Sequence, residues 1–125
     1  MIKDKKQKFN LGAIGIAIIG ILAIILIFTF IDYMVHSLSA DYAVPSYYFR
    51  NKIIFGTLIS LIAYYFIRNK KPATKALIFS ITVAVLLQIR YAIEGYALSF
   101  VLEFLVFHFL ILLSVSYLIF RLMKI

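Results

Sequence analysis

Four long apolar runs, separated by short polar segments, occupy almost the whole chain. The first is the clearest, because no charged residue lies between Leu11 and Ile31. A helix needs about 20 predominantly apolar residues to cross the hydrocarbon core of a bilayer. The pattern therefore predicts four membrane spans, at about residues 10–37, 46–67, 73–93 and 97–120.

The polar segments between the runs contain residues that interrupt helices. Pro45 and Pro72 each suit the first turn of a new helix, where the missing N–H of proline has no cost. Gly95 marks a hinge between the third and fourth runs. Short connections favour antiparallel neighbours. We therefore expect an all-α integral membrane protein, an antiparallel up-down-up-down four-transmembrane-helix bundle that forms a single domain over residues 1–125.

Basic residues gather at one set of run ends. Ten of the 13 Lys and Arg residues lie in the tail at 1–9, in the turn at 68–75, or after the fourth run. The other three are Arg50, Lys52 and Arg90. Cytoplasmic flanks of membrane spans carry the excess of Lys and Arg. The distribution predicts a multi-pass protein with a basic cytoplasmic tail at 1–9 and with both termini in the cytoplasm.

Composition supports the membrane assignment. The chain is 65% hydrophobic with a mean hydropathy of +1.05, whereas soluble domains are about 45–50% apolar. The net charge of +8 could indicate nucleic-acid binding, but the basic residues flank the spans, so we expect anionic lipid headgroups at the cytoplasmic face as the partner and no nucleic acid. The absence of cysteine excludes disulfides, thiolate metal sites and thiol catalysis.

Small residues recur at helical spacing in three of the runs. Such rows let helix backbones approach closely inside a membrane, where lipid supplies no hydrophobic drive for association. They predict packing faces, although small residues are common in spans by chance. The rows are Ala13, Ala17 and Gly20, then Gly56, Ser60 and Ala63, then Ala76, Ser80 and Ala84.

Ionisable residues in or beside membrane spans are candidates for function. Asp32 and His36 lie four apart, on one face of the first helix, near its predicted outer end. Together with Glu94 they form a candidate divalent-metal site, because carboxylate and imidazole suit hard or borderline cations. The alternative for Asp32 is an interfacial ion pair with Arg50, Lys52 or Arg90. No other cofactor is predicted.

Four more polar residues are candidates for contacts inside the membrane or with a partner. Arg90 and Glu94 have i, i+4 spacing, which favours an intrahelical pair, and Gln88 lies one turn deeper, where it could bond to another helix. At about 1.5 Å per residue, His108 falls near the bilayer midplane and Glu103 about a third of the way in. Five residues apart, Glu103 and His108 cannot share a helix face.

These features leave two functions open. Small size, packing faces and the lack of a catalytic motif favour a structural or accessory subunit of a larger membrane complex, which packs beside other membrane subunits or copies of itself. The alternative is an autonomous ion- or proton-handling protein with an outward-facing acidic and histidine-bearing site. An enzyme is the less favoured class. The length and the four spans are similar to those of the small multidrug transporters, whose essential carboxylate lies in the middle of the first helix. Here no charged residue lies between Asn10 and Asp32, so the likeness is one of size alone.

Overall fold

The computed structural model describes residues 10–125, and the predicted basic tail at 1–9 lies outside the described residues. This part of the chain is all-helical and has no strand. Its elements fall close to the four predicted runs. They are α1 (Leu11–His36), the short 3-10 helix η1 (Ala40–Tyr42), α2 (Tyr47–Ile67), α3 (Pro72–Ile93) and α4 (Leu98–Met123).

Local chemistry sets several of the helix ends. The side chain of Asn10 caps α1 by accepting a hydrogen bond from the backbone N–H of Ala13 at 2.8 Å. Pro72 occupies the first turn of α3, as the sequence predicts. After α3 the chain turns at Gly95, whose φ of 96° lies in the left-handed region that favours glycine.

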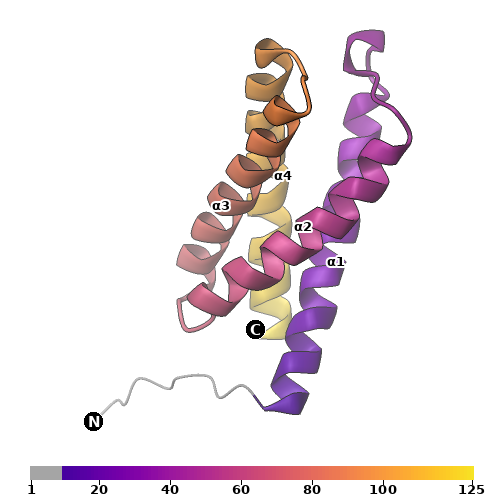
Figure 1. The fold of residues 1–125 in the computed structure, drawn as a ribbon. Helices are drawn as coiled ribbons and strands as arrows, with labels where there is room; N and C mark the ends of the chain where they lie inside the picture. The colour runs from indigo at the N-terminus through magenta and orange to yellow at the C-terminus, as the bar shows by residue number, and fades with distance from the viewer. Residues whose placement is uncertain (1–9) are drawn as a thin grey trace.

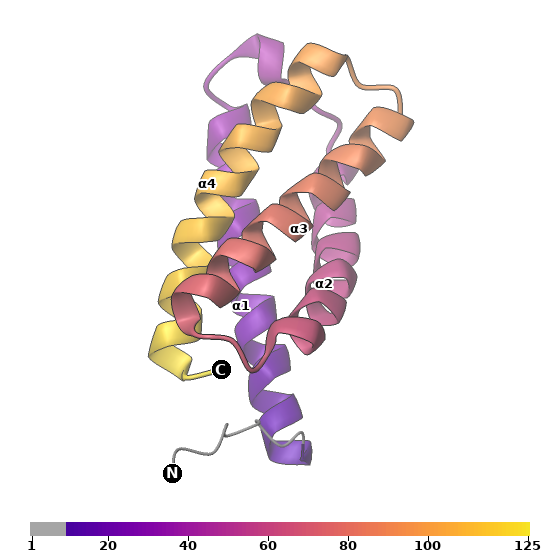
Figure 2. The same cartoon turned by 90° about the vertical axis from the view of Figure 1, so that its left-hand side faces the viewer.

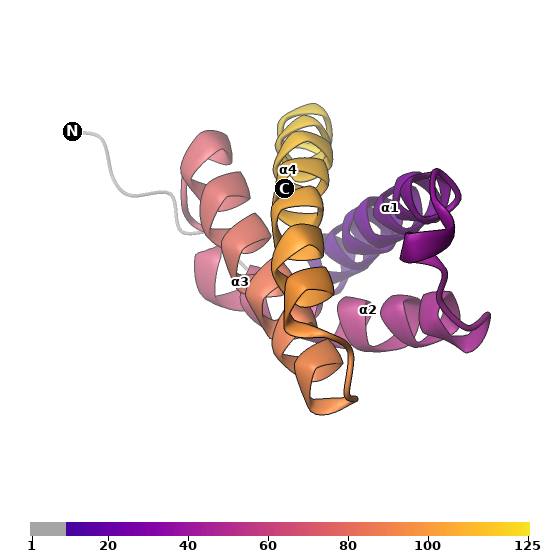
Figure 3. The same ribbon diagram turned by 90° about the horizontal axis from the view of Figure 1, so that it is seen from above.

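Each helix packs mainly against two others. α4 contacts α1 and α3, and α2 contacts the same two helices, crossing them obliquely (Figure 1). Seen from above, α4 lies between α1 and α3 (Figure 3). The α2–α3 turn and residue 125 lie toward one end, and the other two connections lie toward the opposite end (Figure 2). The beginning of α1 extends past the rest of the bundle.

The predicted packing faces are largely buried. Every member of the three small-residue rows is buried except Ala13 and Ala63, which are partly exposed. Large side chains fill the space around them, among them Phe28 of α1, Phe79 of α3 and Phe120 of α4. The core is therefore built where close backbone approach is combined with aromatic packing.

The outer surface of the bundle is also apolar. Large side chains such as Phe30, Ile62 and Phe66 point outward and are more than half exposed. A helix that is hydrophobic all round is typical of a membrane span. Three helices, α1, α3 and α4, are long and apolar enough to cross a membrane, which indicates a multi-pass membrane protein. α2 carries Arg50, Asn51 and Lys52 in its first turns and is not among these three helices.

Candidate functional site

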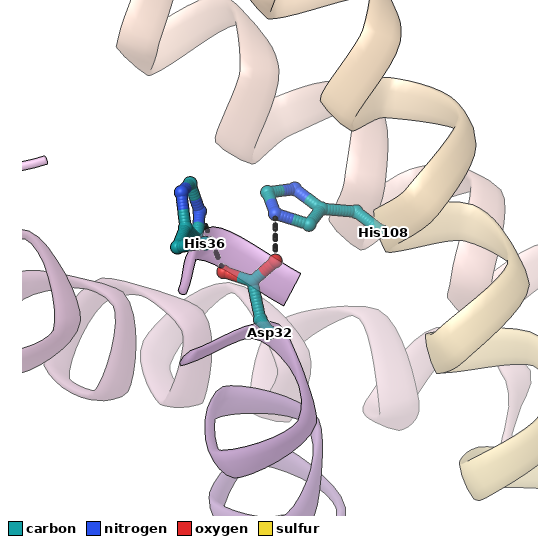
Figure 4. Close-up of side chains that lie close together, drawn as sticks. All are labelled: Asp32, His36 and His108. Carbon is teal, nitrogen blue, oxygen red and sulfur yellow. Dashed lines mark hydrogen bonds and ion pairs between the residues drawn. The ribbon is translucent and has the colours of Figure 1, made fainter. Parts of the chain in front are cut away.

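Four ionisable side chains meet inside the bundle and are called here the Asp32 cluster: Asp32, His36, Lys52 and His108. Asp32 and His36 come from the last turns of α1, Lys52 from the second turn of α2, and His108 from the middle of α4. Asp32 and His108 are completely buried, Lys52 is 1% exposed, and His36 is 6% exposed. Figure 4 shows the Asp32 carboxylate between the two imidazole rings.

The carboxylate of Asp32 is the centre of the cluster. Its Oδ2 atom pairs with the Lys52 ammonium and also lies 3.2 Å from Nε2 of His36. Its Oδ1 atom lies 3.1 Å from Nε2 of His108. One buried carboxylate thus connects α1, α2 and α4, three of the four helices.

The ammonium of Lys52 faces three polar groups. It donates to Asp32 and to the hydroxyl oxygen of Tyr48 at 3.2 Å, and it lies 3.1 Å from Nε2 of His108. The rings of Tyr48 and Phe28 also face it, with centroids at 4.4 and 5.1 Å. Because a buried charge requires pairing, this environment explains how a lysine is held in the core.

The backbone fixes the orientation of His36. Nδ1 of His36 lies 2.7 Å from the carbonyl oxygen of Tyr42, which can only accept, so Nδ1 carries the proton and donates it. In neutral His36 the other nitrogen, Nε2, is then a bare acceptor, and it faces Oδ2 of Asp32, which is also an acceptor. Nε2 accordingly has no hydrogen-bond partner among the described residues. Protonation of Nε2, or a metal ion between the two atoms, would make this contact attractive.

His108 is at a branch point. Its Nε2 atom lies 3.1 Å from both the Lys52 ammonium and Oδ1 of Asp32. A neutral imidazole nitrogen can accept from the lysine or donate to the carboxylate, but it cannot do both. Nδ1 of His108 is buried without a partner in the described part of the chain. The hydrogen bonds of this ring are therefore incompletely satisfied.

The spacing of Asp32, His36 and His108 could hold a metal ion. Each offers one ligand atom, and these atoms all lie within 4.8 Å of one another. The sequence placed Asp32 and His36 in such a site and named Glu94 as the third ligand. The structure brings Asp32 and His36 together but puts His108 in the third position. Glu94 instead lies exposed at the end of α3.

The remaining candidates lie outside the cluster. Nε of Arg90 pairs with Oε1 of Glu94 at 3.2 Å within α3, which is the intrahelical pair that the spacing favours. Gln88 is buried, and its Nε2 donates to the carbonyl of Val101 on α4 at 2.6 Å, so it joins two helices as predicted. The His108 side chain faces the bundle interior, whereas Glu103 is exposed.

Glu103 ties the loop over the cluster to α4. Its Oε1 atom accepts a hydrogen bond of 2.5 Å from the hydroxyl of Tyr42 in η1. This hydrogen bond raises the pKa of the Tyr42 phenol, because the carboxylate favours the protonated donor. Tyr42 therefore contacts His36 through its backbone carbonyl and Glu103 of α4 through its side chain.

Asp32 and His108 lie at different depths in the membrane when their positions are estimated from the sequence, but their side chains are in contact. A straight-helix estimate from Asn10 places it at or beyond the outer edge of the hydrocarbon, about 33 Å away, whereas His108 falls near the midplane. Contact between their side chains puts both residues at one level. The estimate was wrong for their relative depth because it took the start of α1 as the membrane border, although this end of α1 extends past the bundle (Figure 2).

The cluster approaches the surface at His36. A hollow of about 140 Å³ lies there, lined by Tyr33, His36, Ser37, Ala43, Val44 and Phe49. An apolar groove of about 620 Å³ between α1 and α2 shares three of these residues. The His36 ring stacks on Phe104, with centroids 4.2 Å apart and planes inclined by 6°. His36 is therefore the member of the cluster best placed to receive a ligand from outside.

Comparison with known proteins supplies no relative. No family model, curated protein or solved structure matches this chain.

Lys52 is the residue whose role sequence reasoning missed. It was considered for Asp32 only as a partner at the membrane interface, but it lies fully inside the bundle. One signal was available: Tyr48 lies four residues earlier, on the same face, and its hydroxyl oxygen accepts a hydrogen bond from the Lys52 ammonium. A lysine on the aromatic face of an apolar helix needs a buried counter-charge.

Proposed function

We propose that this chain is an ion-handling membrane protein that binds a cation at the Asp32 cluster and exchanges it with the outer face. The contact between Nε2 of His36 and Oδ2 of Asp32 carries this proposal. Nδ1 of His36 donates to the Tyr42 carbonyl, and Nε2 lies 3.2 Å from Oδ2 of Asp32, so a proton or a metal ion is needed to join these two atoms, which have little access to water. The two charges of the cluster, Asp32 and Lys52, pair with each other, whereas Nε2 of His36 has no hydrogen-bond partner among the described residues, and a cation bound beside the carboxylate would give it one.

The proposed topology is the antiparallel up-down-up-down bundle with four spans. α2 is the helix whose composition least resembles a membrane span, because it contains Arg50 and Lys52. The charge of Lys52 is compensated by Asp32 inside the bundle, which lowers the cost of placing it in the membrane. Arg50 is exposed near the start of α2, where its long side chain can reach the headgroups.

Both ends of the chain are proposed to face the cytoplasm. The described basic residues Arg68, Lys70 and Lys71 lie at the α2–α3 turn, away from the end of the bundle that holds η1. This arrangement follows the positive-inside rule and would set the turn against anionic headgroups. The hollow at His36 would then open to the outside.

The accessory-subunit role stays a prediction. It rested on the small size of the chain, on the lack of a catalytic motif and on small-residue faces that could pack against a partner. In the structure these faces pack against other helices of the same chain, because Gly56, Ser60 and Ala84 are buried within the bundle. Co-purification of a stoichiometric larger membrane protein from native membranes in mild detergent would favour that role.

Cation movement in proteoliposomes tests the proposed function. Internal pH dye reports protons after an external acid pulse, and internal calcein reports Co²⁺ by quenching. We expect the wild-type protein to admit at least one of these cations and Asp32→Asn to lose most of that movement. Asp32→Asn keeps the size of the side chain but removes the charge that pairs with Lys52.

Asp41→Asn is the matched control. Asp41 is an exposed carboxylate in η1, outside the cluster, so its neutralisation should leave cation movement unchanged. Equal movement in the wild type and in Asp32→Asn, or movement no faster than in empty vesicles, would contradict the proposed function.

A further inference from the structure

We propose that the cation is a divalent transition metal, held by Asp32, His36 and His108, and that the Lys52 ammonium is the internal cation it must displace. This inference rests on the proposed function and names the class of ion. It assigns to Lys52 a role in setting metal affinity.

The donor set selects the class of metal. Two imidazole nitrogens and one carboxylate oxygen suit Zn²⁺, Co²⁺, Ni²⁺ or Fe²⁺, whereas Mg²⁺ and Ca²⁺ prefer oxygen ligands throughout. Nε2 of His36 and Nε2 of His108 lie 3.2 and 3.1 Å from different oxygens of the same carboxylate. The three ligand atoms therefore converge on one region, within 4.8 Å of each other.

The surroundings of His36 match those of a metal ligand. Ligating histidines almost always donate their second ring N–H to a carbonyl or carboxylate, which fixes the tautomer and the direction of the ring. Nδ1 of His36 does this with the carbonyl of Tyr42 at 2.7 Å, and the stacked ring of Phe104 prevents rotation from the other side. In neutral His36 the lone pair of Nε2 consequently points toward the Asp32 carboxylate, where it could bind a metal ion.

Lys52 occupies the place of a competing cation. Its ammonium pairs with Oδ2 of Asp32 and lies 3.1 Å from Nε2 of His108, so two of the three prospective ligands already face a positive charge. A metal ion at the cluster would repel this ammonium at short range. With an effective dielectric of about 20, such a repulsion is large enough to change affinity by more than tenfold.

Competition between the Lys52 ammonium and the metal ion determines how tightly and how reversibly the site binds the metal. Without the lysine, a buried ligand set would hold a transition metal tightly and release it slowly. With it, departure of the metal is compensated by return of the ammonium to Asp32. We infer that Lys52 keeps binding weak and reversible, which suits a protein that exchanges its ion.

Co²⁺ binding to the purified protein in detergent tests the inference. Visible absorption reports imidazole and carboxylate ligation directly, and titration gives the dissociation constant. We expect Lys52→Met, which keeps the length of the side chain and removes its charge, to bind Co²⁺ at least about tenfold more tightly than the wild type. Lys52→Arg keeps the charge and should bind no more tightly than the wild type.

Lys75→Met is the matched control. Lys75 is also buried, but it lies on α3, where it donates to the carbonyl of Ile125, outside the Asp32 cluster. Its removal should leave Co²⁺ affinity at the wild-type value. If Lys52→Met does not fold, Lys52→Gln replaces it, and helical circular dichroism decides which variant is used.

The outcomes separate this inference from the proposed function. Equal Co²⁺ affinity in the wild type and Lys52→Met overturns the role of Lys52. Absence of Co²⁺ binding from both proteins overturns the metal assignment. If Asp32-dependent proton movement persists in that case, the proposed function stands and the ion is a proton; if neither cation moves, both proposals fail.

Discussion

Lys52 and Asp32 form an ion pair in which neither side chain has any exposed surface. The pair joins α2 to α1 across 20 residues of sequence. Buried ion pairs are poor sources of stability but become strongly destabilising when one partner is removed. This asymmetry yields the first prediction.

Single substitutions in the pair should destabilise the protein more than the double substitution. We expect Lys52→Met or Asp32→Leu to lower the free energy of unfolding by about 3–5 kcal/mol, because each leaves one buried charge without its partner. The double variant should recover much of this loss. Reversible unfolding in mixed micelles at constant pH measures the cycle, and additive single effects would show that the two charges are not coupled.

The Tyr42–Glu103 contact should hold the η1 loop with modest energy. Tyr42→Phe and Glu103→Gln each weaken one partly exposed hydrogen bond, and the expected loss is about 0.5–1.5 kcal/mol. Hydrogen exchange of the amides of η1 should rise in both variants. Glu94→Gln, which affects the Arg90 pair in α3, is the control and should leave exchange in η1 unchanged.

A larger side chain at Ala84 should disrupt packing between α3 and α4. Ala84 is completely buried, so Ala84→Leu forces its neighbours apart and should cost about 1–3 kcal/mol. Val85 follows it on the helix but is 38% exposed, and Val85→Leu should be nearly neutral. Thermal unfolding of both variants compares the two faces, and equal losses would contradict the assignment of the packing face.

Topology is tested by single cysteines in a chain that has none of its own. With both termini in the cytoplasm, a cysteine at Asp41 in η1 should react with an impermeant thiol reagent from outside intact cells. A cysteine at Ala73, at the start of α3, should react only after the cells are opened. The reverse pattern would place the hollow at His36 on the cytoplasmic side.

Local spacing predicted the elements and contacts that depend on one helix at a time. The four helices, the Arg90–Glu94 pair and the burial of most small residues all follow from intervals of three and four residues. Gln88 could also be identified, because a polar side chain inside an apolar run needs a partner on another helix.

The composition of the Asp32 cluster could not be predicted in the same way. Which residue of α2 or α4 faces Asp32 depends on how far each helix slides along its neighbours, and apolar runs place weak limits on that register. His108 lies 76 residues after Asp32 in the sequence, and 56 residues after Lys52. The choice of Glu94 as third ligand failed for this reason, since it assumed that all acidic residues near one face converge.

The hydrogen bond from His36 to the carbonyl of Tyr42 uses an atom that every amino acid possesses. Alanine scanning of the loop would therefore leave it in place and would report position 42 as tolerant, apart from the loss of the phenol. What the bond does depend on is the number of residues between His36 and Tyr42. Insertion or deletion of a single residue in that interval would turn a different peptide group toward the imidazole. The orientation of the His36 ring therefore depends on the length of the loop and not on the side chains of the loop.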